Sequence, residues 1–242
     1  MRSNSESLFT YGRWREALHP IRQELYFLAI SREVFSKFEN TLSANKRLQR
    51  LSEHLFINWI VHNYAVRIGM SIRRITSEHN STKSNLRHLL KQIKKKPGVV
   101  SVENMVRSRM HDRPIPQPPS GASVESIRQE AERIFSETIN REGAKELTAE
   151  QVGDDIERIN ELSKRIIRYA SAVFAHMGKF DVSEDIPKIN EAHECIDVLI
   201  TVFDKYSRLL NAPTEFTIPD DNVLFCDWQK LFSFPWITTK GK

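Results

Sequence analysis

The stretch Arg165-Ile-Ile-Arg-Tyr-Ala-Ser-Ala-Val-Phe-Ala-His-Met-Gly178 predicts the C-terminal part of a long helix that ends at its glycine. Thr148 is typical of a residue that caps the start of a helix, so we expect this helix to run from Thr148 to about Met177. Apolar residues recur along it at helical spacing, and the same spacing leads to His176. A helix dipole stabilises a protonated histidine at this end, and such a histidine can serve as a general acid or base. The alternative interpretation is a packing histidine with one satisfied hydrogen bond.

The rest of the chain shows helical spacing of apolar residues nearly throughout. A second long helix, from about 48 to 75, has an apolar side that includes Trp59 and His62. No segment with strand periodicity is longer than Val99–Val102. The sequence therefore predicts an all-α fold, a helical bundle of long antiparallel helices. The other expected helices span roughly 14–43, a short helix opened by Ser81 and ended by Pro97-Gly98, roughly 123–141, and a helix opened by Ser183 that ends before Pro213.

Residues 111–122 contain four prolines, which exclude a regular helix. We assign them to a loop or insertion of about 97–122 within a single helical domain that covers residues 1–242. The tail, residues 214–242, is rich in aromatic residues, which we expect to pack against the bundle as a short helix plus an extended segment. If the tail is exposed instead, it forms a partner-binding patch.

The composition is that of a protein with a sizeable core, since 40% of its residues are hydrophobic. No apolar run approaches the roughly 18 residues of a membrane span. The first residues have no apolar signal-peptide core. The two cysteines, Cys195 and Cys226, do not form a disulfide framework. We therefore expect a soluble protein of the cytoplasm with no membrane contact.

The net charge of +5 is unevenly distributed. Residues 67–113 contain twelve Lys and Arg against three acids, whereas residues 123–161 contain five against eleven. The basic segment is able to hold a polyanion such as RNA. The acidic segment could cover the basic one, within the fold or in a dimer, and the alternative is two solvated faces of opposite sign.

The best nucleic-acid feature is a basic stripe on the short helix that precedes Pro97. Leu86, Leu89, Leu90 and Ile93 face one way along this helix, and basic residues face the other. Lysine and arginine contacts to phosphates are independent of sequence and sensitive to salt. A solvated face of an amphipathic helix is the alternative. The candidate RNA-binding residues are Lys83, Arg87, Lys91, Lys94 and Lys95, together with Arg73 and Arg74 at the end of the preceding helix.

Neither a metal nor an organic cofactor is expected from the sequence. Glu191, His193, Glu194 and Cys195 are nearly adjacent, whereas two ligands on one helix face are spaced four residues apart. The chain also lacks a glycine-rich phosphate loop and a Gly-x-Ser-x-Gly nucleophile turn.

From Arg165 to Leu210 the sequence resembles the HEPN family of helical bundles, particularly its abortive-infection-like subgroup. In that family a penultimate long helix ends in an arginine, a polar residue, a few further residues and a histidine, often Arg-Asn-Lys-x-x-Ala-His. Here Ala175-His176 matches the end of the motif, and Ser183–Leu210 matches the final helix. Phe35–Phe38, Ile72–Thr76 and Ser84–Leu86 look like the N-terminal part of that subgroup.

The resemblance implies cleavage of RNA without a metal. The substrate is RNA because the chemistry uses the 2′-hydroxyl. It also implies a homodimer in which the motif helices of two protomers face each other. Members of this kind serve as toxins of toxin–antitoxin pairs or as phage-defence components. His176 would be the acid or base.

The sequence departs from the family motif at its arginine. Family members with ribonuclease activity place an arginine at one of the positions that Tyr169, Ala170 and Ser171 occupy here, and the nearest upstream arginine is Arg168. In a continuous α-helix, eight residues separate Arg168 from His176 by about 80° around the axis and about 12 Å along it. Arg73, Arg74 or a second protomer are alternative sources of the cation. Two hypotheses stay open: a ribonuclease with a degenerate motif, and a non-catalytic scaffold that binds a partner protein, a nucleotide or RNA.

Overall fold

The computed structural model describes residues 2–45, 55–77, 85–111, 123–175 and 186–212. These residues confirm the all-α prediction, because their one extended pairing is an isolated bridge between Ser101 and Glu146. A 3₁₀ turn, Pro97–Val99, follows α4, and a π-helical segment, Ala170–Ala175, follows α7. The α-helices are α1 (Arg2–Ala44), α3 (Leu55–Thr76), α4 (Leu86–Lys95), α5 (Val102–His111), α6 (Val124–Ile139), α7 (Ala149–Tyr169) and α8 (Ile189–Leu209).

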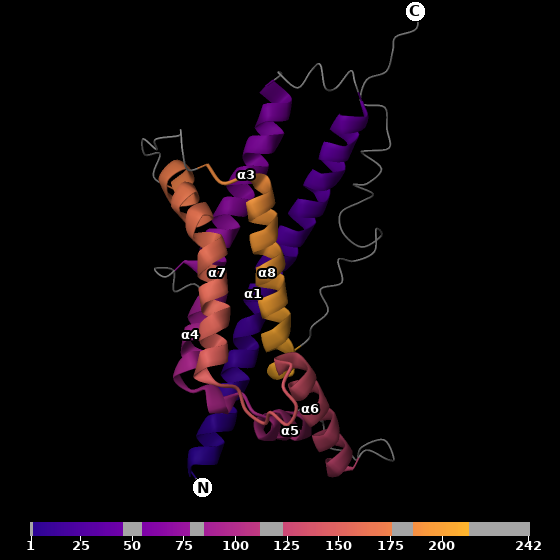
Figure 1. Ribbon diagram of the computed structural model, residues 1–242, viewed down its shortest axis with the longest axis vertical. Coiled ribbons are helices and arrows are strands. Elements are labelled where there is room, and N and C mark those ends of the chain that lie inside the picture. The colour runs from indigo at the N-terminus through magenta and orange to yellow at the C-terminus, as the bar shows by residue number, and fades with distance from the viewer. Residues whose placement is uncertain (1, 46–54, 78–84, 112–122, 176–185, 213–242) are drawn as a thin grey trace, which may run out of the picture.

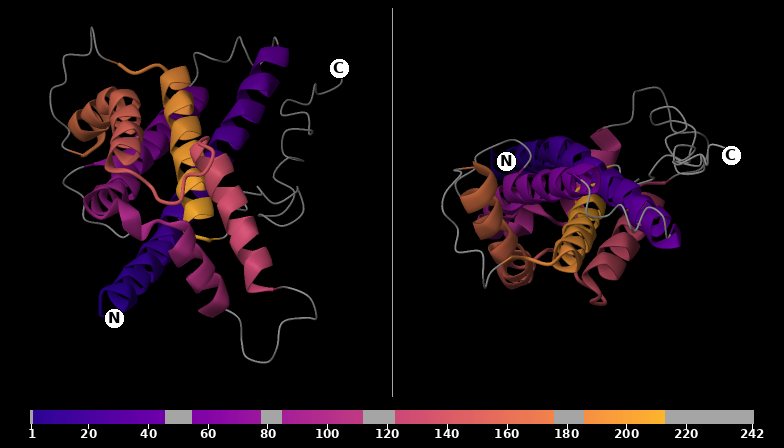
Figure 2. Two further views of the ribbon diagram at one scale, coloured as in Figure 1. Left: turned by 60° about the horizontal axis from the view of Figure 1, so that its bottom comes forward. Right: turned by 90° about the horizontal axis from the view of Figure 1, so that it is seen from above.

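Helix α8 is the central element of the bundle (Figure 2). It lies between α7 and α6, and α1 and α3 cover it from behind. Contacts at both ends show that α8 runs antiparallel to α1: Tyr11 donates a hydrogen bond to the carbonyl oxygen of Leu209 at 2.9 Å, and Arg32 pairs with Asp197. Helix α4 packs against the first half of α7, and α5 and α6 lie near the N-terminal end of α1 (Figure 1).

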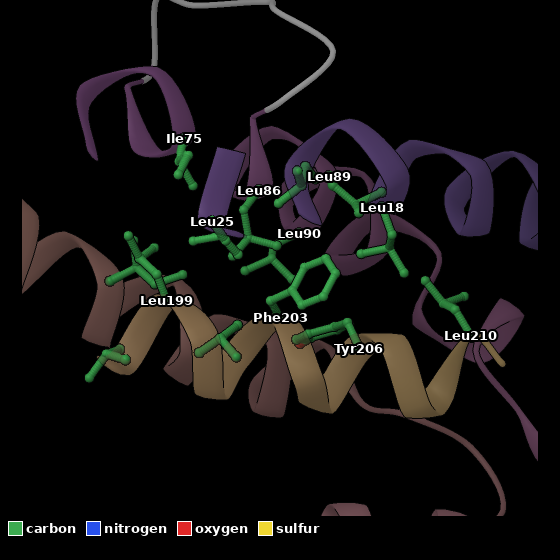
Figure 3. Close-up of a cluster of buried hydrophobic side chains, with 14 of the residues drawn as sticks. Leu18, Leu25, Ile75, Leu86, Leu89, Leu90, Leu199, Phe203, Tyr206 and Leu210 are labelled. Carbon is green, nitrogen blue, oxygen red and sulfur yellow. The ribbon is translucent and has the colours of Figure 1, made fainter. Parts of the chain in front are cut away.

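The centre of the core lies between α8 and the two helices α1 and α4 (Figure 3). Phe203 and Tyr206 of α8 face leucines of α1 and α4, and all of these side chains are buried. Burial of each such side chain stabilises the fold by about 1.5–3 kcal/mol. The labelled leucines of α1 and α4 are Leu18, Leu25, Leu86, Leu89 and Leu90.

The start of α7 is confirmed as predicted. The Thr148 hydroxyl accepts a hydrogen bond from the backbone N–H of Gln151, and the Gln151 side chain accepts one from the backbone N–H of Thr148. This reciprocal capping box satisfies two N–H groups that have no partner inside the helix. The buried residues of α7 follow at helical spacing: Val152, Ile156, Ile159, Ser163 and Ile166.

The prediction for α3 was wrong in part about which face is buried, because Ile72 of the predicted side is buried but other residues of that side are not. Trp59 is 61% exposed and His62 is exposed, whereas Ile57, Tyr64 and Ile68 lie in the core. Both faces of α3 carry large apolar residues, so periodicity alone does not select one of them. Tyr64 tolerates burial because its hydroxyl finds a hydrogen-bond partner in α8.

Four element boundaries also differ from the predictions. Helix α1 begins at Arg2, about twelve residues before the expected start of the first helix. Helix α4 is capped by Asn85, whose side chain accepts a hydrogen bond from the N–H of His88, and not by Ser81. Within the expected loop or insertion of 97–122, residues 102–111 form α5, because the Ser101 hydroxyl caps it by accepting from the N–H of Asn104. Helix α8 begins at Ile189 rather than at Ser183.

Several expected features lie outside the described residues: Ser81, Ser183, the four prolines of 111–122, Cys226 and the aromatic tail. Among the helices described, none has the length and apolar character needed to cross a membrane.

Candidate functional site

The C-terminal half of α7 is joined to the start of α8 by Arg165. Its Nη1 donates hydrogen bonds to both carboxylate oxygens of Glu191, at 2.9 and 3.0 Å. Its Nη2 donates to the carbonyl oxygen of Ile186 at 2.9 Å. A guanidinium that satisfies a carboxylate and a backbone carbonyl together fixes the orientation of the residues it joins. Arg165 therefore holds the first turn of α8 against α7.

Arg168 lies in the last α-helical turn of α7 and is exposed. Three residues separate it from Arg165, so the two side chains leave α7 on the same side, about 60° apart around the axis. His176 lies outside the described residues, and its distance to Arg168 stays a prediction. The structure therefore places one of the two predicted catalytic residues, on the solvent side of α7.

The backbone changes its winding after Tyr169, the residue that follows Arg168. Residues Ala170–Ala175 form a π-helical segment, in which hydrogen bonds reach one residue further than in an α-helix. Such a segment changes the angular position of every residue that follows it. The separation of 80° and 12 Å that a continuous α-helix gives for Arg168 and His176 therefore does not apply. Short π-helical segments of this kind occur frequently at functional sites.

The arrangement of a long capped helix, an arginine near its end and a final antiparallel helix agrees with the result of the family comparison. The model of the HEPN_AbiU2 family (AbiU2) matches residues 12–223. The chain belongs to the HEPN_AbiU2 family. This is a HEPN family of abortive-infection-associated domains. Neither the curated proteins nor the solved structures gave a significant match.

Arg73 and Arg74, the two other arginines considered as sources of the cation, lie at the end of α3. Arg74 donates hydrogen bonds to a carboxylate oxygen of Glu24 at 2.8 Å and to the hydroxyl of Ser71 at 3.1 Å. Its charge is therefore compensated by α1. Arg73 is half-buried, and no ion pair to a described residue involves it. Of this pair, Arg73 is the one better placed to meet an external anion.

The basic stripe of α4 divides into two groups. The opposite, apolar face of α4 is buried, as the pattern predicts. Half-buried Arg87 donates to the carbonyl oxygen of Thr76 at 3.4 Å, and the Lys94 ammonium lies against Gly153 of α7. Exposed Lys95 instead lines a groove beside α1. Lys91 is exposed as well, and Lys83 lies outside the described residues.

A partly buried polar cluster near the start of α8 was not predicted. The Tyr64 hydroxyl lies 2.5 Å from Nε2 of His193, and the Tyr64 ring stacks on Phe35 with 3.8 Å between centroids. Burial, and the nearby Arg32 to a smaller degree, lower the pKa of His193, which keeps the imidazole neutral at pH 7. Burial raises the pKa of Tyr64. The sequence gave no signal for this cluster, because Tyr64 lies opposite the face of α3 that the periodicity favoured.

The residues considered as metal ligands have separate roles in the HEPN_AbiU2 fold. Glu191 binds Arg165, His193 contacts Tyr64, and the Cys195 thiol is buried, which raises its pKa to about 12. Within the described part of the chain, no group of three or more His, Cys, Asp or Glu residues is arranged to hold a metal ion.

Proposed function

We propose that this HEPN_AbiU2 protein acts on RNA in the cytoplasm as a metal-independent ribonuclease, in a toxin–antitoxin or phage-defence role. His176 is the general acid or base, and Arg168 supplies positive charge. The observation that carries the proposal is the position of Arg168. It is exposed in the last turn of the α7 helix of a HEPN chain, two residues before a π-helical segment that ends at Ala175 and is followed in sequence by His176.

In the proposed reaction His176 takes the proton of a ribose 2′-hydroxyl. The 2′-oxygen attacks the adjacent phosphorus, and the bond from phosphorus to the 5′-oxygen breaks. The products are a 2′,3′-cyclic phosphate and a 5′-hydroxyl, which receives a proton from an acid. Arg168 stabilises the negative charge that develops on the phosphoryl oxygens. In a homodimer the two copies of His176 serve as base and acid.

A second function is favoured by the two arginines that are already engaged. Glu191 holds Arg165, and Glu24 holds Arg74, so both charges are used inside the fold. A chain in which carboxylates of the fold neutralise these arginines is suited to act as a non-catalytic scaffold that binds a partner protein, a nucleotide or RNA.

The test is incubation of the purified protein with mixed RNA. We expect wild type to degrade the RNA in the presence of a chelator, and His176→Ala to abolish decay. Arg168→Ala should slow it by 10-fold or more, because the charge on phosphorus loses a stabilising cation. Lys164→Ala, an exposed change on the same helix, is the matched control. Equal RNA decay in wild type and His176→Ala would exclude catalysis and leave the scaffold function.

A further inference from the structure

A groove lies between the N-terminal third of α1 and the end of α4 with the 3₁₀ turn after it. It consists of two hollows of about 460 Å³ and about 400 Å³ that share Thr10 and Lys96. Each is within the range of roughly 300–1,000 Å³ that is usual for ligand sites. The larger hollow is lined by Thr10, Arg13, Trp14, Ala17, Gln92, Lys95 and Lys96.

The charge of the larger hollow is positive. Arg13, Lys95 and Lys96 line it, and among the described residues no carboxylate does. Lys96 lies 3.5 Å from Glu6, but both side chains are more than half exposed, so this pair is weak. No ion pair to a described residue involves Lys95. The hollow therefore has a surplus of positive charge that the fold itself does not neutralise.

An exposed aromatic ring stands beside these cations. Phe9 is 66% exposed, and the Arg13 guanidinium lies 6.0 Å from the centroid of its ring. Phe9 and Arg13 are four residues apart on α1 and therefore share a helix face. Thr10 and Gln92 add a hydroxyl and an amide to the lining. A cationic hollow with an exposed ring next to one of its cations is typical of sites that bind single-stranded nucleic acid, where cations bind phosphates and bases stack on the ring.

We propose that this groove binds single-stranded RNA, with phosphates on Arg13, Lys95 and Lys96 and a base stacked on Phe9. The inference rests on the proposed function for RNA as the ligand, but it involves different residues. The groove lies at the end of the bundle that contains the N-terminus of α1, whereas α7 ends at the opposite end (Figure 1). The groove is an anchoring site for an RNA chain, separate from the site of cleavage.

The binding test uses a fluorescein-labelled 20-nucleotide oligo-U RNA and fluorescence anisotropy. The full chain carries His176→Ala in every variant, so that cleavage does not consume the probe. Arg13→Glu with Lys95→Glu should weaken binding at least 10-fold and reduce the slope of log K against log salt by about two, one for each lost phosphate contact. Phe9→Ala should weaken binding by roughly 5-fold or more with an unchanged slope, because stacking is not ionic.

The matched control is Arg158→Glu with Lys37→Glu, which changes the net charge equally at two exposed positions away from the groove. Circular dichroism confirms that each variant is folded. Unchanged affinity of the groove variant overturns the inference, and so does equal weakening by the control pair. If millimolar UMP or millimolar inorganic phosphate displaces the RNA, the inference is also overturned, because the site then takes small phosphates rather than an RNA chain.

The two proposals fail separately. RNA decay is measured in parallel with His176 intact. If His176→Ala leaves decay unchanged while the groove variant loses binding, the ribonuclease proposal fails and the groove remains. If the groove variant binds RNA like wild type while His176→Ala abolishes decay, the groove proposal fails and the ribonuclease remains.

Discussion

The α7–α8 pair is fastened at both ends by charged side chains, but the two fastenings differ in burial. At the Asp155 end, Oδ2 of Asp155 accepts hydrogen bonds from the Lys205 ammonium at 2.7 Å and the Tyr206 hydroxyl at 2.8 Å. Only 16% of the Asp155 side chain and 22% of the Lys205 side chain are exposed. At the Arg165 end, the corresponding fractions are 39% for Arg165 and 35% for Glu191.

Burial decides how much each end contributes to stability. A charge pair shielded from water is costly to break, whereas a solvated pair contributes little. The Asp155 end therefore secures the bundle, and the Arg165 end orients the turn that precedes α8 with a small energetic contribution. The segment that leads to His176 belongs to the more weakly fastened end. Under the proposed ribonuclease function, a segment that admits and releases RNA is better placed at that end.

The largest expected effect is at the Asp155 end. Asp155→Ala leaves the Lys205 ammonium without its partner and the buried Tyr206 hydroxyl without its acceptor. We expect a loss of about 3 kcal/mol in the free energy of unfolding, measured by urea denaturation. Asp154→Ala removes a neighbouring exposed carboxylate and should cost less than about 0.5 kcal/mol. Equal losses in the two variants would show that the Asp155 cluster does not secure the bundle.

The sequence predicted features that depend on neighbouring residues better than features that depend on contacts between distant parts of the chain. The Thr148 cap and the buried face of α4 were predicted because a cap needs only neighbours in sequence and the α4 face is strongly amphipathic. The buried face of α3 was not, because Trp59 and Tyr64 are both aromatic. Long-range contacts distinguish them: Tyr64 shares a hydrogen bond with His193, 129 residues away, and stacks on Phe35 of α1.

The candidate site was predictable to a smaller extent. The exposed position of Arg168 near the end of α7 follows from helix periodicity. The π-helical segment after it has no signature in periodicity, which assumes one constant winding. The pairing of Arg74 with Glu24 depends on which helices pack together, so sequence reasoning counted Arg74 as an available cation. The pairing of Arg165 with Glu191 is likewise a contact between two helices that the sequence did not indicate. The groove likewise joins α1 and α4, about 80 residues apart in sequence.

A smaller effect is expected at the Arg165 end. A double-mutant cycle of Arg165→Ala and Glu191→Ala should give a coupling energy of about 0.5–1 kcal/mol that decreases with added salt. Arg165→Ala alone should cost more than Glu191→Ala alone, because it also removes the hydrogen bond to the Ile186 carbonyl. The same cycle at Asp155 and Lys205 is the comparison. A coupling energy at the Arg165 end that equals or exceeds the one at the Asp155 end would contradict the assigned roles.

The smallest expected effect is a dependence of stability on pH that arises from His193, near the start of α8. Burial and Arg32 lower the pKa of His193 in the folded state, partly offset by Asp197, so the unfolded chain takes up the proton first as the pH falls. Stability is therefore complete above the unfolded pKa of about 6.5 and is lost as the pH falls towards the folded pKa. Urea denaturation of wild type between pH 7.5 and pH 5 should show this loss, and His193→Gln, which does not titrate, should lack its share of it.

Tyr64→Phe tests whether burial of His193 or its hydrogen bond to Tyr64 causes this pH dependence. It removes the hydroxyl next to His193 but leaves the imidazole partly buried. Because burial is the main cause of the lowered pKa, Tyr64→Phe should retain the loss of stability between pH 7.5 and pH 5. A flat profile in Tyr64→Phe would instead assign the effect to the hydrogen bond.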